Sequence, residues 1–311
     1  MERLAVVNGV LLVDKPLGFT SHDVVAYTRR LFQIKKVGHL GTLDPLATGL
    51  LVLCLGKATR LAKFMSGWDK VYTGIVRLSH STTTYDLEGE PLGKPTDVRV
   101  QKEKIISLLP GFHGRIRQLP PKFSAKKVRG KPIHRYARQG IPVQVEAVEI
   151  EIYDIKLLNL LPNQLWLRVS CSAGTYLRSL AHDIGQALGC GGYLSYLRRV
   201  RFGSFSLADA LPMDQLFRIC QKDKLEEKII PVEALLPELP ALIVDSQGRR
   251  KLLHGMRLSR GECQGKIPIP AEKDYCKALD QQGKLLALGR FVQTDDSSGE
   301  EFQPEVVLVD R

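Results

Sequence analysis

GHLGTLDPLATGLL, residues 38–51, is the most informative stretch of this 311-residue chain. It places one carboxylate, Asp44, in a loop punctuated by glycines, which permit tight bends and close approach by another chain. The ring of Pro45 moves Asp44 out of the helical region toward an extended backbone. The apolar run 50–55 that follows predicts a short buried strand. A carboxylate fixed at the start of a strand indicates a catalytic group, whereas an isolated Asp-Pro would more often start a turn.

The composition is that of a globular protein, with 44% apolar and 25% charged residues. The length suits one large domain and one small one. No apolar run reaches the roughly 18–20 residues that span a bilayer. The first eight residues lack the apolar segment of a signal peptide. We therefore expect a cytoplasmic protein that does not bind membranes.

The cysteines predict neither a zinc site nor disulfides. None of the six belongs to a C-x-x-C pair, and no histidine cluster accompanies them. In a cytosolic chain of this size we expect reduced, mostly buried thiols. The sequence also lacks a P-loop and a dinucleotide-binding fingerprint. We expect no cofactor and no metal.

The formal charge of +12 favours a polyanionic partner, most often a nucleic acid. Basic residues are concentrated between residues 113 and 145, a segment that contains no Asp or Glu. Its nine cations are Arg115, Arg117, Lys122, Lys126, Lys127, Arg129, Lys131, Arg135 and Arg138. Because such a segment repels itself unless a phosphate backbone neutralises it, RNA contact is favoured over a merely solvated loop.

Apolar spacing predicts an α+β domain with a mixed or antiparallel sheet, because several strands follow one another directly. The predicted strands cover residues 9–14, 50–55, 71–78, 148–160, 164–172 and 202–205. The predicted helices cover residues 22–32, 57–66, 98–109, 174–188 and 193–199. Ser21 is the expected N-cap of the first helix.

The end of the chain predicts a small β-rich module. A segment rich in Pro, Leu and Glu at 231–240 indicates a domain boundary, which divides the chain into domains of residues 1–233 and 234–311. Residues 277–279 and 284–288 flank a turn sequence and predict a hairpin. Residues 295–301 predict a loop and residues 306–309 a closing strand.

Several motifs between residues 9 and 205 resemble, in order, those of the TruB family of tRNA pseudouridine synthases. They are D-K-P-x-G-x-T-S-H-D at 14–23, G-T-L-D-P at 41–45, T-x-T-x-D-x-x-G at 82–89, Q-x-P-P-x-F-S-A at 118–125, G-T-Y-L-R at 174–178 and the segment 189–199. The resemblance implies a pseudouridine synthase catalytic domain, an RNA-gripping insertion at 113–145 and a C-terminal PUA-like RNA-binding domain. It also implies isomerisation of the T-loop uridine 55 of tRNA after base flipping, by a monomer that binds the T stem-loop and needs no protein partner.

The same resemblance implies the site residues. Asp44 would be the essential catalytic residue, held ionised by a paired Arg178, as expected for a carboxylate in a partly dry pocket. Tyr72 would stack on the flipped uracil and assist proton transfer at C5, and Leu197 would form an apolar wall. His39 would hold the flipped RNA, and Lys15 would buttress the catalytic loop and contact RNA. The expected RNA contacts in the insertion are Lys122, Lys126, Lys127, Arg129 and Lys131.

Two features depart from the family pattern. This chain has His134-Arg135-Tyr136 where the family more often has Tyr followed by an acidic residue. It also has Phe123 where the family commonly has Tyr. Both lie in the insertion, so they bear on RNA contact and not on chemistry. Two other interpretations remain open. One is the RNA-guided archaeal and eukaryotic relative of the family, which the basic insertion disfavours. The other is a non-catalytic RNA-binding protein or RNA chaperone, which leaves Asp44 and Arg178 unexplained. A basic structural or DNA-binding protein ranks last.

Overall fold

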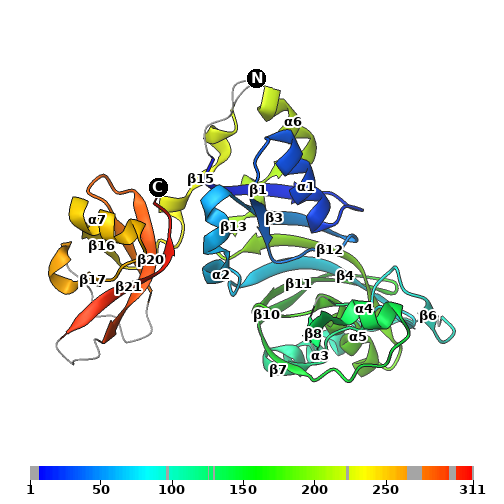
Figure 1. Cartoon of the computed structure of the whole chain (residues 1–311). Helices are drawn as coiled ribbons and strands as arrows, with labels where there is room; N and C mark the ends of the chain where they lie inside the picture. The colour runs from blue at the N-terminus through cyan, green and yellow to red at the C-terminus, as the bar shows by residue number, and fades with distance from the viewer. Residues whose placement is uncertain are drawn as a thin grey trace.

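The computed structural model describes residues 7–95, 98–124, 126–128, 130–221, 224–264, 275–293 and 299–309. Figure 1 shows a long twisted sheet with helices on its faces, and a separate β-rich unit formed by the C-terminal segment. The α+β class and the mixed sheet predicted from the sequence are confirmed. The element bounds are given in the next two paragraphs.

The large sheet has the strand order β14-β1-β3-β12-β4-β11-β10-β7, with β2, β13 and β15 paired alongside. Its strands are β1 (Gly9–Lys15), β2 (Val37–Leu40), β3 (Ala47–Leu55), β4 (Lys70–Leu78), β7 (Gly114–Gln118), β10 (Val148–Leu161), β11 (Gln164–Cys171), β12 (Gly192–Phe202), β13 (Phe205–Ser206), β14 (Leu211–Pro212) and β15 (Ile230–Pro231). The α-helices of this part are α1 (Ser21–Leu31), α2 (Ala62–Met65), α3 (Lys102–Leu108), α4 (Ile133–Arg138), α5 (Leu177–Ala187) and α6 (Met213–Gln221). Two small hairpins pair β5 (Ser81–Thr82) with β6 (Pro91–Leu92) and β8 (Lys127–Val128) with β9 (Lys131–Pro132).

The C-terminal sheet has the order β17-β21-β20-β19-β16-β18. It comprises β16 (Ala241–Val244), β17 (Leu258–Ser259), β18 (Cys263–Gln264), β19 (Cys276–Leu279), β20 (Leu285–Gln293) and β21 (Glu300–Val307), with helix α7 (Ser246–Leu253). The predicted hairpin is confirmed as the antiparallel pair β19 and β20. The β-rich tail is therefore confirmed and fits a PUA-like domain. The predicted loop at 295–301 falls mostly outside the described residues.

Strand β3 contributes side chains to two hydrophobic cores, because it is buried on both faces. Leu51, Leu53 and Leu55 enter the main core, where α1 and α5 cover the sheet. The alternate residues Leu50 and Val52 enter a second core that also contains side chains of β20 and β21. Such two-sided burial explains why the sequence of this strand is a continuous apolar run, with no polar alternation.

Polar contacts reinforce this junction. Lys63 Nζ lies 2.7 Å from Glu305 Oε2, and Lys57 Nζ donates to the carbonyl of Leu308 at 2.6 Å. The ring of Phe64 meets Tyr275 edge to face at 4.7 Å. The C-terminal unit is thus held against the 3-10 turn and α2 that follow β3. Within the described part of the chain, no helix has the length and apolar character needed to cross a membrane.

Three local predictions were wrong. The predicted strand at 202–205 is instead the turn between β12 and β13, because Phe202 and Phe205 pair with each other across it. Residues 193–199 form part of strand β12 and not a helix, because this segment pairs with β3 on one side and β4 on the other, in the middle of the sheet. Central pairing overrides the local pattern of a Tyr, Leu and Arg-rich segment. The N-cap of α1 is Thr20, which forms a capping box with Asp23. Ser21 is instead the first helical residue, and its hydroxyl is used elsewhere.

Gly49 allows β3 to approach β12 closely. Its φ of +96° lies in the region that favours glycine, and a Cβ there would lie 2.4 Å from the carbonyl oxygen of Arg199. We expect Gly49→Ala to lower the free energy of unfolding by about 2–4 kcal/mol, since backbone strain and overpacking combine. Chemical denaturation measures this. Gly67→Ala is the control, because nothing lies within 4 Å of its Cβ position. Equal stability of the two variants would contradict the close-packing argument.

Candidate active site

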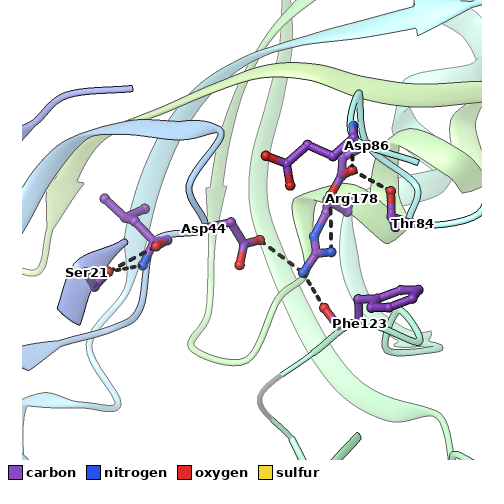
Figure 2. Close-up of polar contacts among 8 residues, drawn as sticks. Ser21, Asp44, Thr84, Asp86, Phe123 and Arg178 are labelled. Carbon is purple, nitrogen blue, oxygen red and sulfur yellow. Dashed lines mark hydrogen bonds and ion pairs between the residues drawn. The ribbon is translucent and has the colours of Figure 1, made fainter. Parts of the chain in front are cut away.

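Asp44 lies in the short loop between β2 and β3, just before β3 begins to pair with β12. Ser21 fixes this loop from α1: its Oγ donates to the Leu43 carbonyl at 3.0 Å and accepts from the Leu43 N–H at 2.8 Å (Figure 2). Both hydrogen bonds are buried. The residue before the carboxylate is therefore held at both of its backbone polar groups, which restricts how Asp44 can move.

Removing the Ser21 hydroxyl should loosen the loop that carries Asp44. We expect Ser21→Ala to cost about 1–3 kcal/mol of stability, because the buried Leu43 N–H loses its partner. The variant should also lose roughly three- to tenfold in turnover, since the carboxylate is less well oriented. Thermal unfolding and single-turnover rates measure the two effects. Ser66→Ala, which removes an exposed hydrogen bond to Lys63, is the control. Unchanged turnover in Ser21→Ala would show that the hydroxyl does not position Asp44.

Lys15 lies beneath the same loop and is fully buried. Its ammonium donates to the carbonyls of Phe19 at 2.5 Å and Pro16 at 3.0 Å, and reaches that of Pro45 at 3.5 Å. Burial lowers the pKa of Lys15 to about 8, although the nearby Asp44 charge opposes the shift. The structure thus places Lys15 where it supports the residue that follows Asp44. Its side chain is closed off from solvent.

Arg178 reaches the loop from the first turn of α5. Gln118, at the end of β7, holds this helix start: its Oε1 accepts from the Tyr176 N–H at 2.8 Å and its Nε2 donates to the Tyr176 carbonyl at 3.1 Å. Ser179 Oγ also donates to the Leu119 carbonyl at 2.7 Å. Residues 118 and 119, near the start of the basic segment 113–145, therefore fix the helix that carries Arg178.

The guanidinium of Arg178 lies between two carboxylates. Its Nη2 is 3.0 Å from Asp44 Oδ2, and its Nη1 is 3.2 Å from Asp86 Oδ2 (Figure 2). Nη2 also donates to the Phe123 carbonyl at 2.8 Å. The Arg178 side chain is 9% exposed and that of Asp44 is 41% exposed. The structure thus brings together the predicted pair and leaves Asp44 as the member of the network that is open to solvent.

Asp86 is the component that the sequence analysis did not assign to the site. Its carboxylate accepts from the Thr84 hydroxyl and from the Glu88 N–H, and its side chain is 3% exposed. The loop that carries it is pinned to β12, because the Leu87 N–H donates to the Leu194 carbonyl at 3.0 Å. The signal was present in the T-x-T-x-D-x-x-G motif, in which hydroxyl residues precede Asp86. Asp86 anchors Arg178 from the side opposite Asp44.

Opposing effects set the charge of Asp44. Burial raises the pKa of Asp44 above its ordinary value, and the Asp86 charge adds to this. Arg178 is the main opposing influence, with a smaller contribution from Lys15. An ionised carboxylate that is partly desolvated is a stronger base and nucleophile than one in water. The site therefore suits chemistry that begins with attack or proton removal by Asp44.

Tyr72 and Leu197 supply an apolar surface beside the loop. They lie on β4 and β12, and they line one apolar pocket with Leu177 and Leu180 of α5. Tyr72 is 8% exposed and Leu197 is 9% exposed. Burial raises the pKa of Tyr72, and the positive charge of Arg199 opposes the shift. The sequence analysis did not identify Arg199, which is fully buried.

The predicted RNA contacts lie in several places. His39 is half-buried on β2, where burial lowers its pKa and its Nδ1 meets no hydrogen-bond partner among the described residues. Lys122 and Lys131 are exposed, and Lys126 Nζ donates to the Glu146 carbonyl at 3.2 Å. Arg129 lies outside the described residues, as does the side chain of Lys127.

The functional groups at the site are a carboxylate, a guanidinium and a phenol. Within the described ranges, no group of three His, Cys, Asp or Glu side chains is arranged to hold a metal ion. The arrangement can hold one carboxylate charged at the edge of an apolar pocket and can stabilise charge that develops next to it.

Sequence comparisons agree with this geometry. Residues 29–177 match the family described as TruB family pseudouridylate synthase (N terminal domain), and residues 178–237 match the tRNA pseudouridylate synthase B C-terminal domain. The chain is 44% identical over 285 residues to tRNA pseudouridine synthase B of Solibacter usitatus, covering 92% of this chain and 96% of that protein. It is 41% identical over 290 residues to the protein of the same name in Burkholderia pseudomallei, covering 93% and 95%. The chain belongs to the TruB family of pseudouridine synthases.

Solved structures show the same fold. A chain of an archaeal box H/ACA sRNP Nop10–Cbf5 complex superposes with a TM-score of 0.72 at 27% identity, covering 98% of this chain and 88% of that one. A chain from an H/ACA RNP bound to a substrate RNA containing 2′-deoxyuridine gives the same TM-score and identity, with 98% and 86% covered. The match extends over both sheets of the present structure.

Proposed function

We propose that this chain converts uridine 55 in the T loop of tRNA to pseudouridine after flipping the base out of the loop. The observation that carries the proposal is the ion pair of Asp44 with Arg178, anchored by Asp86 and set beside the apolar pocket of Tyr72 and Leu197. Relatives that match more than nine-tenths of the chain are named tRNA pseudouridine synthase B. A flipped base costs a few kcal/mol of unstacking, which contacts to the loop and a ring such as Tyr72 offset.

The reaction is an isomerisation. The N1–C1′ bond breaks, the uracil rotates and a C5–C1′ bond forms. The proton on C5 is then lost and N1 gains one, so the substrate has no net gain or loss of atoms or electrons. In our proposal, Asp44 starts the reaction as nucleophile or base, and Arg178 keeps it ionised. Tyr72 stacks on the base and assists proton transfer at C5, and Leu197 excludes water.

An unmodified tRNA transcript tests the proposal. Incubation with the purified chain should release the hydrogen of C5, followed with tritium-labelled uridine, and mapping should locate one pseudouridine at position 55. A transcript with cytidine at that position should give no product. Absence of product, or product elsewhere with position 55 untouched, would refute the assignment. Activity of the chain alone on bare tRNA would also separate this function from that of the RNA-guided relative.

We propose that the basic segment 113–145 grips the T stem-loop. Its cations Lys122, Lys131 and Arg135 are exposed, and within the described residues the segment contains no carboxylate to neutralise them. His39 would contact the flipped loop beside Asp44. The C-terminal domain, beginning near residue 234, would add a second RNA contact. We further propose that the protein acts as a cytoplasmic monomer without a protein partner.

A tRNA-folding activity is a second candidate, favoured by the position of this basic surface on an element distinct from the carboxylate. If it exists, Asp44→Asn should still accelerate refolding of a misfolded tRNA. A simultaneous change of Lys122, Lys131 and Arg135 to Gln should abolish that acceleration. Loss of refolding in Asp44→Asn would count against an independent chaperone role.

A further inference from the structure

Arg199 is a buried cation whose position the proposed chemistry has not yet used. It lies on β12, directly opposite Tyr72 of β4 and Gly49 of β3 in the sheet register. Its exposed fraction is 0%, which makes it one of the largest fully buried side chains of the protein. Because Tyr72 and Arg199 are cross-strand partners, their side chains lie on the same face of the sheet.

The guanidinium spans the catalytic loop. Its Nε donates to the Leu50 carbonyl at 2.8 Å, after Asp44 in the chain. Its Nη2 donates to the Gly41 carbonyl at 2.9 Å and approaches that of Leu40 at 3.5 Å, both before Asp44. Tyr72 is its register partner on β4, and the positive charge of Arg199 opposes the rise that burial gives the pKa of Tyr72. One side chain therefore links both ends of the loop, and it starts from the backbone position directly opposite Tyr72.

The charge of Arg199 is not balanced by an acid. Among the residues that the structure describes, it forms no ion pair with a carboxylate. Its ring contact is Phe202, with Arg199 Cζ 5.4 Å from the ring centroid, and Lys70 Nζ lies over the same ring at 4.8 Å. Burying a cation without a counter-ion is costly. Carbonyls could be bridged by a neutral side chain, so the positive charge itself calls for a role.

We propose that Arg199 is a positioning residue that acts through Tyr72: it donates to the phenol oxygen and favours negative charge there while a proton moves between the base and Tyr72. The inference rests on the proposed isomerisation. In that step the C5–H bond breaks and its electron pair restores the C5–C6 double bond. Tyr72 first gives its phenol proton to N1 and then, as a phenolate, accepts the C5 proton, so the side chain ends unchanged. The adjacent guanidinium stabilises the charge that the phenol oxygen carries in between.

A double-mutant cycle with a pH series tests the inference. Arg199→Gln keeps an amide donor but removes the charge. We expect it to slow single-turnover product formation by about 10- to 100-fold near neutral pH, with tRNA binding changed less than about twofold. The loss should shrink as the pH rises from about 6 to about 9.5, because a phenolate forms more readily at high pH without the cation's help.

The Tyr72→Phe background supplies the decisive comparison. There, Arg199→Gln should cost at most about twofold more, and the recovery at high pH should vanish. The groups whose charges shift the pKa of Tyr72 are Arg199 from β12, Cys171 from β11 and Asp44 from the loop. Burial raises the pKa of Cys171 to about 11 and lowers that of Lys70, beside Arg199, to about 8. A pH effect of Lys70 does not need the phenol hydroxyl. It should therefore persist when Tyr72→Phe is compared with and without Arg199→Gln, and this comparison separates it from the effect of Tyr72.

Arg168→Gln is the matched control, since Arg168 is exposed on β11 and its neighbour Val169, not Arg168 itself, is the register partner of Tyr72. If Arg199→Gln fails to fold, Arg199→Lys replaces it; this variant retains the charge and should lose less activity, with no recovery at high pH. Losses that multiply in the double variant, or a loss in Arg199→Gln that is constant with pH, would overturn the inference. A wild-type chain that forms no pseudouridine would instead refute the proposed function.

Discussion

Asp44→Asn should abolish pseudouridine formation while leaving tRNA binding intact. The substitution keeps the shape of the side chain and removes the charge that the proposed reaction begins with. We expect a fall in single-turnover rate of at least about a thousandfold, equivalent to about 4 kcal/mol of activation free energy. Tritium release from C5 measures the rate, and filter binding measures the affinity for tRNA, which should change by less than about threefold.

The fold of this variant should not suffer. Burial raises the pKa of Asp44, with Asp86 adding to the shift, so the folded state holds this proton more tightly than the unfolded state does. Stability from such a group is lost as the pH rises through its folded pKa, and the ionised Asp44 therefore destabilises the protein at neutral pH. Asp44→Asn removes that charge, and its unfolding temperature should equal or exceed that of the wild type.

Asp154→Asn provides the control, because Asp154 is an ion-paired carboxylate on the exposed part of β10, 3.1 Å from Lys156. It should retain full activity. Product formation by Asp44→Asn at more than a few per cent of the wild-type rate would contradict the assignment of Asp44. An unfolding temperature well below that of the wild type would contradict the electrostatic account of the loop.

Arg178→Met should weaken both catalysis and folding. It removes the main influence that lowers the pKa of Asp44, so a smaller fraction of Asp44 is ionised at a given pH. We expect a rate about 100- to 1,000-fold lower near neutral pH, and an acid limb of the pH–rate profile that moves to higher pH. Asp86 is left as a buried charge without its partner, which should cost about 3–5 kcal/mol of stability.

A second substitution separates these two effects. Arg178→Met combined with Asp86→Asn removes the uncompensated charge and should regain much of the lost stability without regaining activity. Arg178→Lys should remain impaired, because a single ammonium cannot reach Asp44, Asp86 and the Phe123 carbonyl together. An acid limb unchanged in Arg178→Met would show that Arg178 does not control the ionisation of Asp44.

The sequence allowed most of the large elements to be predicted. The strand after Asp44 is an apolar run because both of its faces are buried. The helix that carries Arg178 has apolar residues at core spacing and begins at Leu177, three residues after the predicted start. These features depend on local composition and periodicity, which a sequence displays directly.

Local patterns failed where distant pairing decides the outcome. Residues 193–199 were predicted to be helical, yet they form the central strand that touches both β3 and β4. The hydroxyl at position 21 was predicted to cap a helix, yet it holds the Leu43 backbone 22 residues later in the chain. In both cases a partner far along the chain offers more hydrogen bonds or burial than the local alternative.

By itself, the sequence determined that a proline-fixed carboxylate precedes a buried strand, and the motif around Asp44 indicated its family. Tertiary structure alone decided what surrounds that carboxylate. Asp86 and Arg199 lie 42 and 155 residues beyond Asp44; the signal for Asp86 was its place in the T-x-T-x-D-x-x-G motif, and Arg199 does not stand out by residue type or spacing. They become site residues only because the folded sheet brings β12, and the loop between β5 and β6, against the loop that carries Asp44. The energy of a charge depends on its burial and its partners, and these exist only once the chain has folded.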